Sequence, residues 1–262
     1  MIDRRPSVIV RCRTAEDVSL AVRYAVLNEK RLTVRGGGHN VAGTAVDDDA
    51  VMVDLSLMRD VVVDTKASRA YVDGGATLLD VDAATVEHGL ACPSGVVSET
   101  GLGGLALGGG YGWLARKWGL TCDHIVAADV VLADGSRIHV SQDDQPELLW
   151  GLRGGGGNFG VVTRFELLLR PVGSAVVRTA KLPASPARVA AYREFAAGQT
   201  DDLQAVITLH GPERAGEPPT MTARTVWIGA PEPEAAACTA LFRALECAPP
   251  PPVTMSHLDL QT

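Results

Sequence analysis

Apolar residues recur along the first sixty positions with two different periods, which predicts a helix between short strands. Strands are predicted where β-branched and other apolar residues cluster, at 8–11, 32–34 and 51–55. A helix is predicted over 14–29, because Thr14 is a suitable N-cap and an acid follows three residues later. Five apolar residues then recur at the spacing of one helix face: Val18, Ala21, Val22, Ala25 and Val26.

Two antiparallel hairpins are predicted before residue 170. The first joins 61–63 to 70–72 through a polar turn. The second joins 125–132 to 137–140 through Asp134-Gly135, a dipeptide that favours tight hairpin turns. The other elements expected in this part of the chain are helices over 77–88 and 147–152 and a strand over 161–169.

Pro171 and Gly173 interrupt the pattern, so we place a domain boundary near residue 172. Beyond it, strands alternate with helices. The proline run 249–252 is expected to be extended, and no final helix is expected after it. The strands are predicted at 175–181, 203–209 and 221–228, and the helices at 186–197 and 232–245.

Composition excludes several classes of protein. Hydrophobic residues make up 46% of the chain and charged residues 21%, which is typical of a folded globular protein and not of a disordered one. The net charge of -7, with no basic run longer than Arg4-Arg5, argues against nucleic acid as a partner. No apolar run approaches the roughly 18 residues of a membrane helix, so we expect no membrane association.

Processing and metal signals are equally sparse. The N-terminus is charged and has no apolar segment like that of a secretory signal, so a cytoplasmic location is expected. The five cysteines contain no CxxC pair, and the six histidines have no ligand spacing. We therefore expect reduced thiols and no metal site.

Glycine is enriched, with 28 residues among 262, and it concentrates in three segments: 35–40, 101–112 and 154–160. We interpret these as loops, because consecutive N–H groups in tight glycine turns form a concave anion site. Three such loops together indicate one large ligand contacted mainly by backbone. A phosphate-binding Walker A loop is excluded because no Gly-Lys pair occurs, and the spacing of a Rossmann dinucleotide fingerprint is also absent.

These segments carry a family resemblance. The stretch Val34–Gly43, which contains His39, resembles the histidine-bearing loop of flavoproteins with the FAD-binding fold of vanillyl-alcohol oxidase and p-cresol methylhydroxylase (PCMH). More narrowly it resembles berberine-bridge-enzyme-like oxidoreductases of the bacterial type. Pro93–Trp113 is similar to their isoalloxazine-binding stretch, and Gly119–Asp123 and Trp150–Val162 also match. The resemblance covers about residues 5–172.

The resemblance implies an α+β fold rather than a doubly wound sheet. Residues 1–172 would be a PCMH-type FAD-binding domain of two α+β subdomains. Residues 173–262 would begin an antiparallel-sheet substrate domain with helices. The implied function is transfer of a hydride from an alcohol- or amine-type C–H donor to covalently bound flavin, with electrons passing to oxygen or another acceptor. The implied partner is a small-molecule substrate.

The resemblance also assigns site residues. His39 matches the histidine that carries FAD covalently, and residues 36–40 would hold the pyrophosphate through backbone N–H groups. The position at which many relatives attach FAD through a second residue, a cysteine, falls on Val97, and Cys92 lies five residues too early, so a single covalent link is expected. The complete set of expected cofactor contacts is Arg35, Gly36, Gly37, Gly38, His39, Asn40, Gly43, Thr100, Gly101, Gly104, Gly108, Gly109, Gly110, Tyr111, Gly112, Asp123, Gly160 and Val162.

Three questions stay open at this point. Tyr111 is the aromatic hydroxyl nearest the flavin stretch, and either catalysis or packing in a tight turn would explain it. Thr100 falls on the position that relatives associate with oxygen access, where its residue type is uninformative. Family members are considerably longer and carry their catalytic base and a Tyr-x-Asn return segment farther along. The alternative function is therefore a non-catalytic or incomplete FAD-binding fragment that lacks the C-terminal catalytic segment, and the substrate and oligomeric state cannot be predicted.

Overall fold

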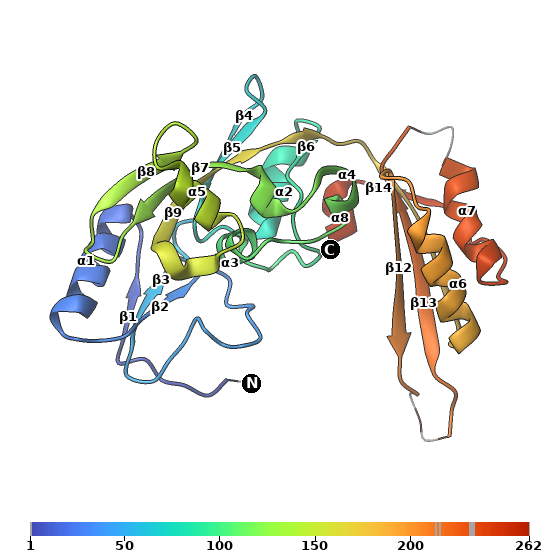
Figure 1. Ribbon diagram of the computed structural model, residues 1–262, viewed down its shortest axis with the longest axis horizontal. Coiled ribbons are helices and arrows are strands. Elements are labelled where there is room, and N and C mark those ends of the chain that lie inside the picture. Colours follow the sequence, from blue (N-terminus) through green and yellow to red (C-terminus); the bar gives the residue numbers. More distant parts are fainter. Residues whose placement is uncertain (1, 213, 215, 231–233, 262) are drawn as a thin grey trace. The chain divides into compact units, whose positions relative to one another are not determined.

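The protein is described by a computed structural model, which covers residues 2–212, 214, 216–230 and 234–261 (Figure 1). Its chain divides into two compact units. Unit 1 contains the described residues up to 115, residues 119–171 and Gln261. Unit 2 contains residues 116–118 and 172–260.

Unit 1 begins with a small parallel sheet, in the order β1 (Val8–Arg11), β3 (Val51–Asp54) and β2 (Leu32–Arg35). Helix α1 (Ala15–Leu27) connects β1 to β2 and begins with the expected capping box, in which Thr14 and Asp17 exchange hydrogen bonds. Its inner face packs on β3. Val26 was predicted to lie on this face, but it is 59% exposed, because the helix surface turns away from the sheet there.

The larger sheet of unit 1 is antiparallel, in the order β4-β5-β9-β7-β8. Both predicted hairpins are present and pair in register, β4 with β5 and β7 with β8. Phe165 and Leu167 of β9 and Ile125 of β7 lie in its buried core. The strand bounds are Val61–Asp64 for β4, Arg69–Asp73 for β5, Ile125–Val131 for β7, Arg137–Ser141 for β8 and Val161–Leu168 for β9.

Helices and short segments complete unit 1. Helix α2 (Leu78–Val86) begins with a capping box between Thr77 and Asp80. The remaining elements are β6 (Leu90–Ala91), α3 (Leu102–Leu107), the 3-10 helix η1 (Thr121–His124), α5 (Pro146–Leu152), the 3-10 helix η2 (Gly156–Phe159) and β10 (Arg170–Pro171). Prediction of a loop over the whole of residues 101–112 was wrong, because α3 lies within it. The absent Gly103 side chain lets this helix approach the Gly74 carbonyl, so tertiary packing outweighs the poor helix propensity of glycine.

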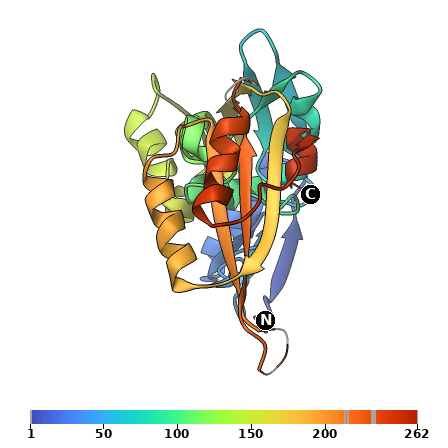
Figure 2. The ribbon, with the colours of Figure 1, turned by 90° about the vertical axis from the view of Figure 1, so that its right-hand side faces the viewer.

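Unit 2 is an antiparallel sheet in the order β12-β13-β11-β14, and α6 and α7 lie along one face of it (Figures 1 and 2). Side chains of α7, including Leu241 and Phe242, pack with Met221 of β13 in a buried core. The described elements are α4 (Ala115–Trp118), whose last three residues belong to this unit, β11 (Ala175–Pro183), α6 (Pro186–Ala197), β12 (Leu203–His210), β13 (Thr220–Trp227), α7 (Glu234–Ala244), β14 (Val253–Met255) and α8 (His257–Gln261).

The two helices at the end of unit 2 differ from the prediction in different ways. The helix expected over 232–245 is present from residue 234, and residues 232–233 lie outside the described part of the chain. The expectation of no final helix was wrong. Ser256 caps α8 by accepting from Asp259 N at 3.1 Å, while the Asp259 carboxylate accepts from Ser256 N at 3.2 Å. This capping box was visible in the sequence and was overlooked.

Among the described residues, no helix is both long enough and apolar enough to cross a membrane.

Candidate functional site

The loop after β2 presents His39 at the surface of unit 1. The strand ends at Arg35, whose Nη1 lies 3.4 Å from the buried Asp54 carboxylate on β3. Gly38 then takes a positive φ of 73°, which an L side chain rarely adopts, and His39 follows with its ring exposed. Asn40 closes the loop, because its Oδ1 accepts from Ala42 N at 2.8 Å. The backbone around His39 is therefore fixed from both sides.

The first two glycine segments meet at a junction of bare backbone. A Cβ on Gly37 would overlap the Gly101 backbone, and a Cβ on Gly101 would overlap that of Gly37. Gly74, in the turn after β5, lies beneath both segments. Its carbonyl oxygen is 2.7 Å from the Cβ position of Gly103 and 3.6 Å from that of Gly36. At Gly37, Gly101 and Gly103 only glycine permits these approaches, whereas the distance at Gly36 is an ordinary van der Waals contact.

Backbone hydrogen bonds hold the junction together. Leu102 N donates to Ala76 O at 2.8 Å, and Leu78 N donates to Thr100 O at 2.9 Å. These bonds join the start of α3 to the start of α2. Gly74 N in turn donates to Thr163 O of β9 at 2.9 Å. The start of α3 is thus fastened to the larger sheet through the turn at Gly74.

The second glycine segment has one packed side and one open side. Gly101 and Gly103 are buried, whereas Gly104 and Gly108 are exposed on α3. No atom lies within 4 Å of the position that a Gly104 Cβ would take. Packing therefore explains Gly103 but not Gly104, and the open side of α3 can accept a ligand close to its backbone.

The end of this segment is a tight turn. Gly109 and Gly110 both have positive φ, and Gly112 packs against the Ser94 and Gly95 carbonyls. Tyr111 lies between them and is 61% exposed. This exposure is compatible with packing of Tyr111 in the turn as well as with a role at the flavin.

The third glycine segment is anchored by Arg153. Its Nε and Nη2 donate to Ile125 O at 2.9 and 2.6 Å. The backbone that follows is open, because the Cβ positions of Gly154, Gly156 and Gly157 meet no atom within 4 Å. The segment ends where Gly160, with φ of 139°, passes the Val131 carbonyl and leads into the buried Val162. Element η2, inside this segment, packs near α3.

Comparison with known families decides what this arrangement is. A profile of the FAD binding domain family matches residues 6–141, which is more than half of the chain. The chain belongs to the FAD binding domain family. The matched region lies within unit 1 apart from residues 116–118. The cofactor of this protein is accordingly FAD, as the resemblance implied.

Named relatives place the chain among the FAD-linked oxidoreductases. It is 45% identical over 166 residues to (R)-6-hydroxynicotine oxidase of Paenarthrobacter nicotinovorans, covering 63% of this chain and 36% of that protein. It is 42% identical over 172 residues to aclacinomycin-N/aclacinomycin-A oxidase of Streptomyces galilaeus, covering 62% and 31%. The expected membership of the vanillyl-alcohol oxidase and PCMH superfamily is confirmed.

A solved structure confirms the fold. The 6-hydroxy-D-nicotine oxidase from Arthrobacter nicotinovorans superimposes with a TM-score of 0.87 at 32% identity, covering 98% of this chain and 58% of that one. The predicted α+β, PCMH-type architecture is therefore correct. The chain spans little more than half the length of that structure and about a third of the length of the curated relatives it matches.

The residues of this FAD-binding chain fit the cofactor at its backbone. Gly104, Gly154, Gly156 and Gly157 leave Cβ positions empty, so a large ligand can approach the main chain. His39 presents an exposed ring beside the glycine junction. Which of the expected residues contact FAD stays a prediction.

Two features qualify the sequence-based site. Asp123 was expected at the cofactor, and its carboxylate accepts from Leu120 N at 2.8 Å and packs on Gly119, so it has a structural role at the start of η1. Gly74 and Gly75 were not selected, although they bring the segments together. Their signal was a Gly-Gly pair placed between a strand and the Thr77 capping box.

The Cys92 thiol, just before the flavin stretch, is unreactive because it is buried. Cys92 is fully buried, and this burial, together with the nearby Asp82 carboxylate, raises the pKa of its thiol. A protonated, buried thiol is a poor nucleophile. Val97, the position on which the resemblance places the second attachment residue, is 45% exposed. Val97 is thus accessible but carries no thiol, and Cys92 carries a thiol that is not accessible.

His124 is a buried neutral histidine just after the Gly119–Asp123 motif. It is 1% exposed, and its Nδ1 donates to Leu120 O at 3.0 Å. Its Nε2 accepts from Arg170 Nε at 3.4 Å. Burial lowers the pKa of His124 from its ordinary value of 6.5, and the Leu120 hydrogen bond only partly opposes this. Burial therefore favours the neutral form of His124 in the folded state.

The stability of the protein should fall in acid because of His124. The unfolded chain takes up a proton at His124 below about pH 6.5 while the folded chain resists it, so this stability is present above pH 6.5 and is lost as the pH falls below it. Free energies of unfolding, measured from about pH 8 to about pH 5, should decline less steeply in His124→Gln, whose amide can make both hydrogen bonds without titrating. Equal slopes in the two proteins would contradict this assignment.

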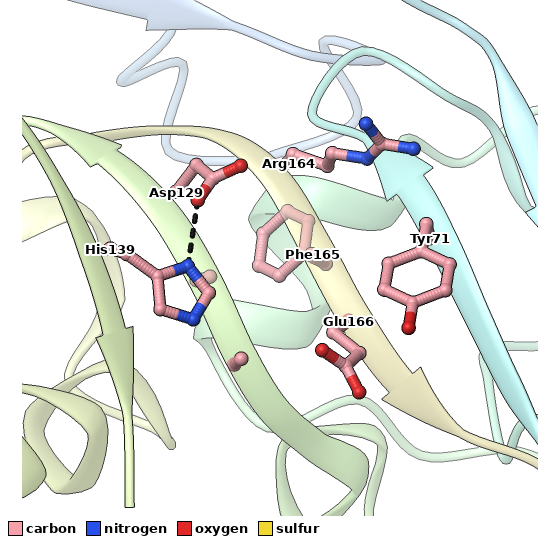
Figure 3. Close-up of a pocket in the computed structure, with 8 residues that line it drawn as sticks. Tyr71, Asp129, His139, Arg164, Phe165 and Glu166 are labelled. Carbon is pink, nitrogen blue, oxygen red and sulfur yellow. Dashed lines mark hydrogen bonds and ion pairs between the residues drawn. The ribbon is translucent and has the colours of Figure 1, made fainter. Parts of the chain in front are cut away.

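None of the residues that line the hollow on the open face of the larger sheet is a predicted site residue; Figure 3 draws this lining. Its volume is about 360 Å³. Its polar lining consists of cross-strand pairs: His139 Nδ1 lies 2.9 Å from Asp129, and the Arg164 guanidinium lies 5.5 Å from the Tyr71 ring centre. Glu166 on β9 is ion-paired at its rim with Arg69 of β5. Such pairs are typical of an antiparallel sheet face open to water, and we assign the hollow no reaction.

Proposed function

We propose that this chain is the FAD-binding part of an oxidoreductase that takes a hydride from an alcohol- or amine-type C–H donor. The observation that carries the proposal is the glycine junction, where the His39 loop, the turn at Gly74 and the start of α3 meet through bare backbone. When bound, FAD supplies the hydride acceptor, and oxygen or another acceptor removes the electrons. The relatives that match are named as oxidases of a nicotine derivative and of aclacinomycins, which supports a small organic substrate.

The backbone of this chain is proposed to bind and orient the cofactor. Amides of 36–38 would donate to its pyrophosphate, because successive glycine N–H groups form a concave anion site. The open backbone at Gly104 of α3 and at Gly154, Gly156 and Gly157 would let planar parts of the cofactor lie against the main chain. Further contacts are proposed at the remaining sequence-predicted positions, among them Thr100 and Tyr111.

His39 is proposed to hold FAD through a single covalent bond. The exposed ring follows Gly38 on a loop closed at Asn40, so it is accessible to a ligand bound at the glycine junction. Cys92 is unavailable for a second bond because it is buried with a raised pKa. A fixed cofactor loses less freedom on reaching the reactive geometry, which favours the transfer.

The two domains are proposed to divide the work. Residues 1–172 would bind FAD, and residues 173–262 would form part of a domain that binds the substrate. Tyr111, a residue that is 61% exposed, is a candidate within the flavin stretch for holding or moving a proton, and packing in its tight turn is the alternative role. Removal of the second proton from an alcohol or amine needs such a group.

The proposed reaction is tested by anaerobic mixing of the FAD-loaded protein with a panel of secondary amines, primary alcohols and oligosaccharides. Bleaching of the visible flavin band by at least one donor is the expected result, because a hydride that reaches the flavin abolishes that absorption. Dithionite serves as the positive control for flavin reduction. A yellow protein that no donor bleaches, but dithionite does, would favour the alternative of an FAD-binding fragment without catalysis.

A further inference from the structure

Helix α1 carries an apolar stripe on the side that faces away from its core. Leu20, Tyr24 and Leu27 are 56%, 47% and 83% exposed. Their spacing of four and three residues places them in one line along the helix. The buried side chains Val18, Ala21, Val22 and Ala25 occupy the opposite side. We refer to Leu20, Tyr24 and Leu27 as the α1 stripe.

This arrangement departs from the usual surface helix, whose outer face is polar. Single exposed apolar residues are common, but three in a line expose a continuous surface on the order of a few hundred Å², which is the scale of interaction sites. Contact of this apolar surface with water is unfavourable, in proportion to the apolar area exposed. The stripe is therefore a surface whose covering would be favourable.

We propose that the α1 stripe binds the same stripe of a second copy of this chain, with the two helices antiparallel. A two-fold axis midway between positions 20 and 27 places Leu20 of each copy opposite Leu27 of the other. Leucine thus meets leucine at both ends, and the two Tyr24 rings lie near the axis. An isologous contact of this kind closes on itself as a dimer.

The charges at the two ends of α1 favour the antiparallel direction. Glu16 lies in the first turn, and Lys30 lies just beyond the last. The same axis places position 16 of one copy opposite position 31 of the other, so Glu16 lies one residue from the point opposite Lys30, and the helix dipoles also oppose each other favourably. Asp17 is already bound in the capping box, and Glu29 partly cancels the charge of Lys30. The charges therefore favour the antiparallel direction, while burial of the α1 stripe supplies most of the attraction between the two copies.

Existing contacts at these ends do not prevent the pairing. Glu16 is bound to Arg137 at 3.4 Å, but both side chains are about half exposed, and such surface pairs contribute little. Arg23, beside the stripe, donates to Gly135 O at 3.2 Å, which holds the hairpin turn against the helix. The helix that would dock is therefore rigidly mounted on unit 1.

The expected dimer is weak. A helix of 13 residues is about 20 Å long at 1.5 Å per residue. Two such helices would bury about 800 Å² in total, which is below the 1,200–2,000 Å² of stable specific complexes. Association should accordingly depend on concentration in the micromolar range rather than persist at high dilution.

The test is the molecular mass in solution, measured by sedimentation velocity and light scattering over a dilution series of the full chain. We expect a monomer–dimer equilibrium that the double variant Leu20→Gln, Leu27→Gln weakens at least tenfold. Val26→Gln is the matched control, because Val26 is 59% exposed on the same helix but lies outside the stripe. Circular dichroism melting verifies that all variants are folded.

A charge exchange tests the direction of pairing. Glu16→Lys should weaken the dimer, and addition of Lys30→Glu in the same chain should restore it. A monomer at every concentration would overturn the proposal, as would a dimer that the double leucine variant leaves unchanged. Failure of the charge exchange to restore association would overturn the antiparallel arrangement.

Discussion

Replacement of His39 by alanine should convert covalently held flavin into flavin that is fully released by acid precipitation. The reason is that His39, exposed on a loop closed at Asn40, is the proposed attachment point, and the buried Cys92 offers no second one. The wild-type pellet should retain the flavin, and peptide mapping should give one flavin-bearing peptide, which contains His39. The fold should persist, with a change in unfolding free energy within about 0.5 kcal/mol, since surface substitutions usually cost no more.

His139→Ala is the matched control for this experiment. Its ring is also exposed on unit 1, but it lies in the hollow on the sheet and not beside the glycine junction. The variant should keep its flavin in the pellet. Complete extraction of flavin from the wild-type protein would show that there is no covalent bond, and a flavin-bearing Cys92 peptide would show that the attachment is not single.

Alanine at Gly101 should unfold or severely destabilise unit 1, whereas alanine at Gly104 should leave it folded. A Cβ on Gly101 would overlap the Gly37 backbone, which cannot rotate away, so we expect a loss of about 3 kcal/mol or more. A Cβ on Gly104 meets no atom within 4 Å. Because alanine favours a helix over glycine, Gly104→Ala should gain about 0.5–1 kcal/mol in the absence of FAD. Urea unfolding of the cofactor-free proteins measures both.

The affinity for FAD is a second property by which the substitutions at Gly101 and Gly104 should differ. Gly104→Ala should bind FAD at least tenfold more weakly although it is the more stable apoprotein, because the methyl group occupies space proposed for the cofactor. Gly173→Ala is a control outside the site, since its Cβ position is also open. Unchanged FAD affinity in Gly104→Ala would remove α3 from the proposed site, and a stable Gly101→Ala would contradict the close backbone contact.

Local signals in the sequence were sufficient for most secondary structure. The Thr14 and Thr77 capping boxes begin α1 and α2 where the sequence predicts them, and Asp134-Gly135 forms the predicted hairpin turn. These features depend on residues close together in the chain, which exchange hydrogen bonds with one another. The helix at Ser256 followed the same rule and was missed because its signal was not applied there.

Helix α3 could not be predicted in this way. Its sequence has two glycines in six residues, and glycine disfavours a helix. The helix forms because Gly103 packs on the Gly74 carbonyl and Leu102 is buried, and both contacts involve residues brought together by the fold. The apolar spacing correctly predicted most of the buried face of α1, but exposure of Val26 and of the α1 stripe depends on packing, because apolar residues occur on both sides of this helix.

The sequence by itself determined that this chain carries the FAD-binding motif set, with His39 in a triple-glycine loop and no thiol at Val97. Those features are residue identities at fixed positions, so no structure was needed to find them. Tertiary structure decided which glycines are required for packing and which are open. That distinction depends on atoms from segments far apart in the chain: Gly37 and Gly101 touch each other, whereas Gly104 faces empty space, and a glycine in the sequence looks the same in both cases.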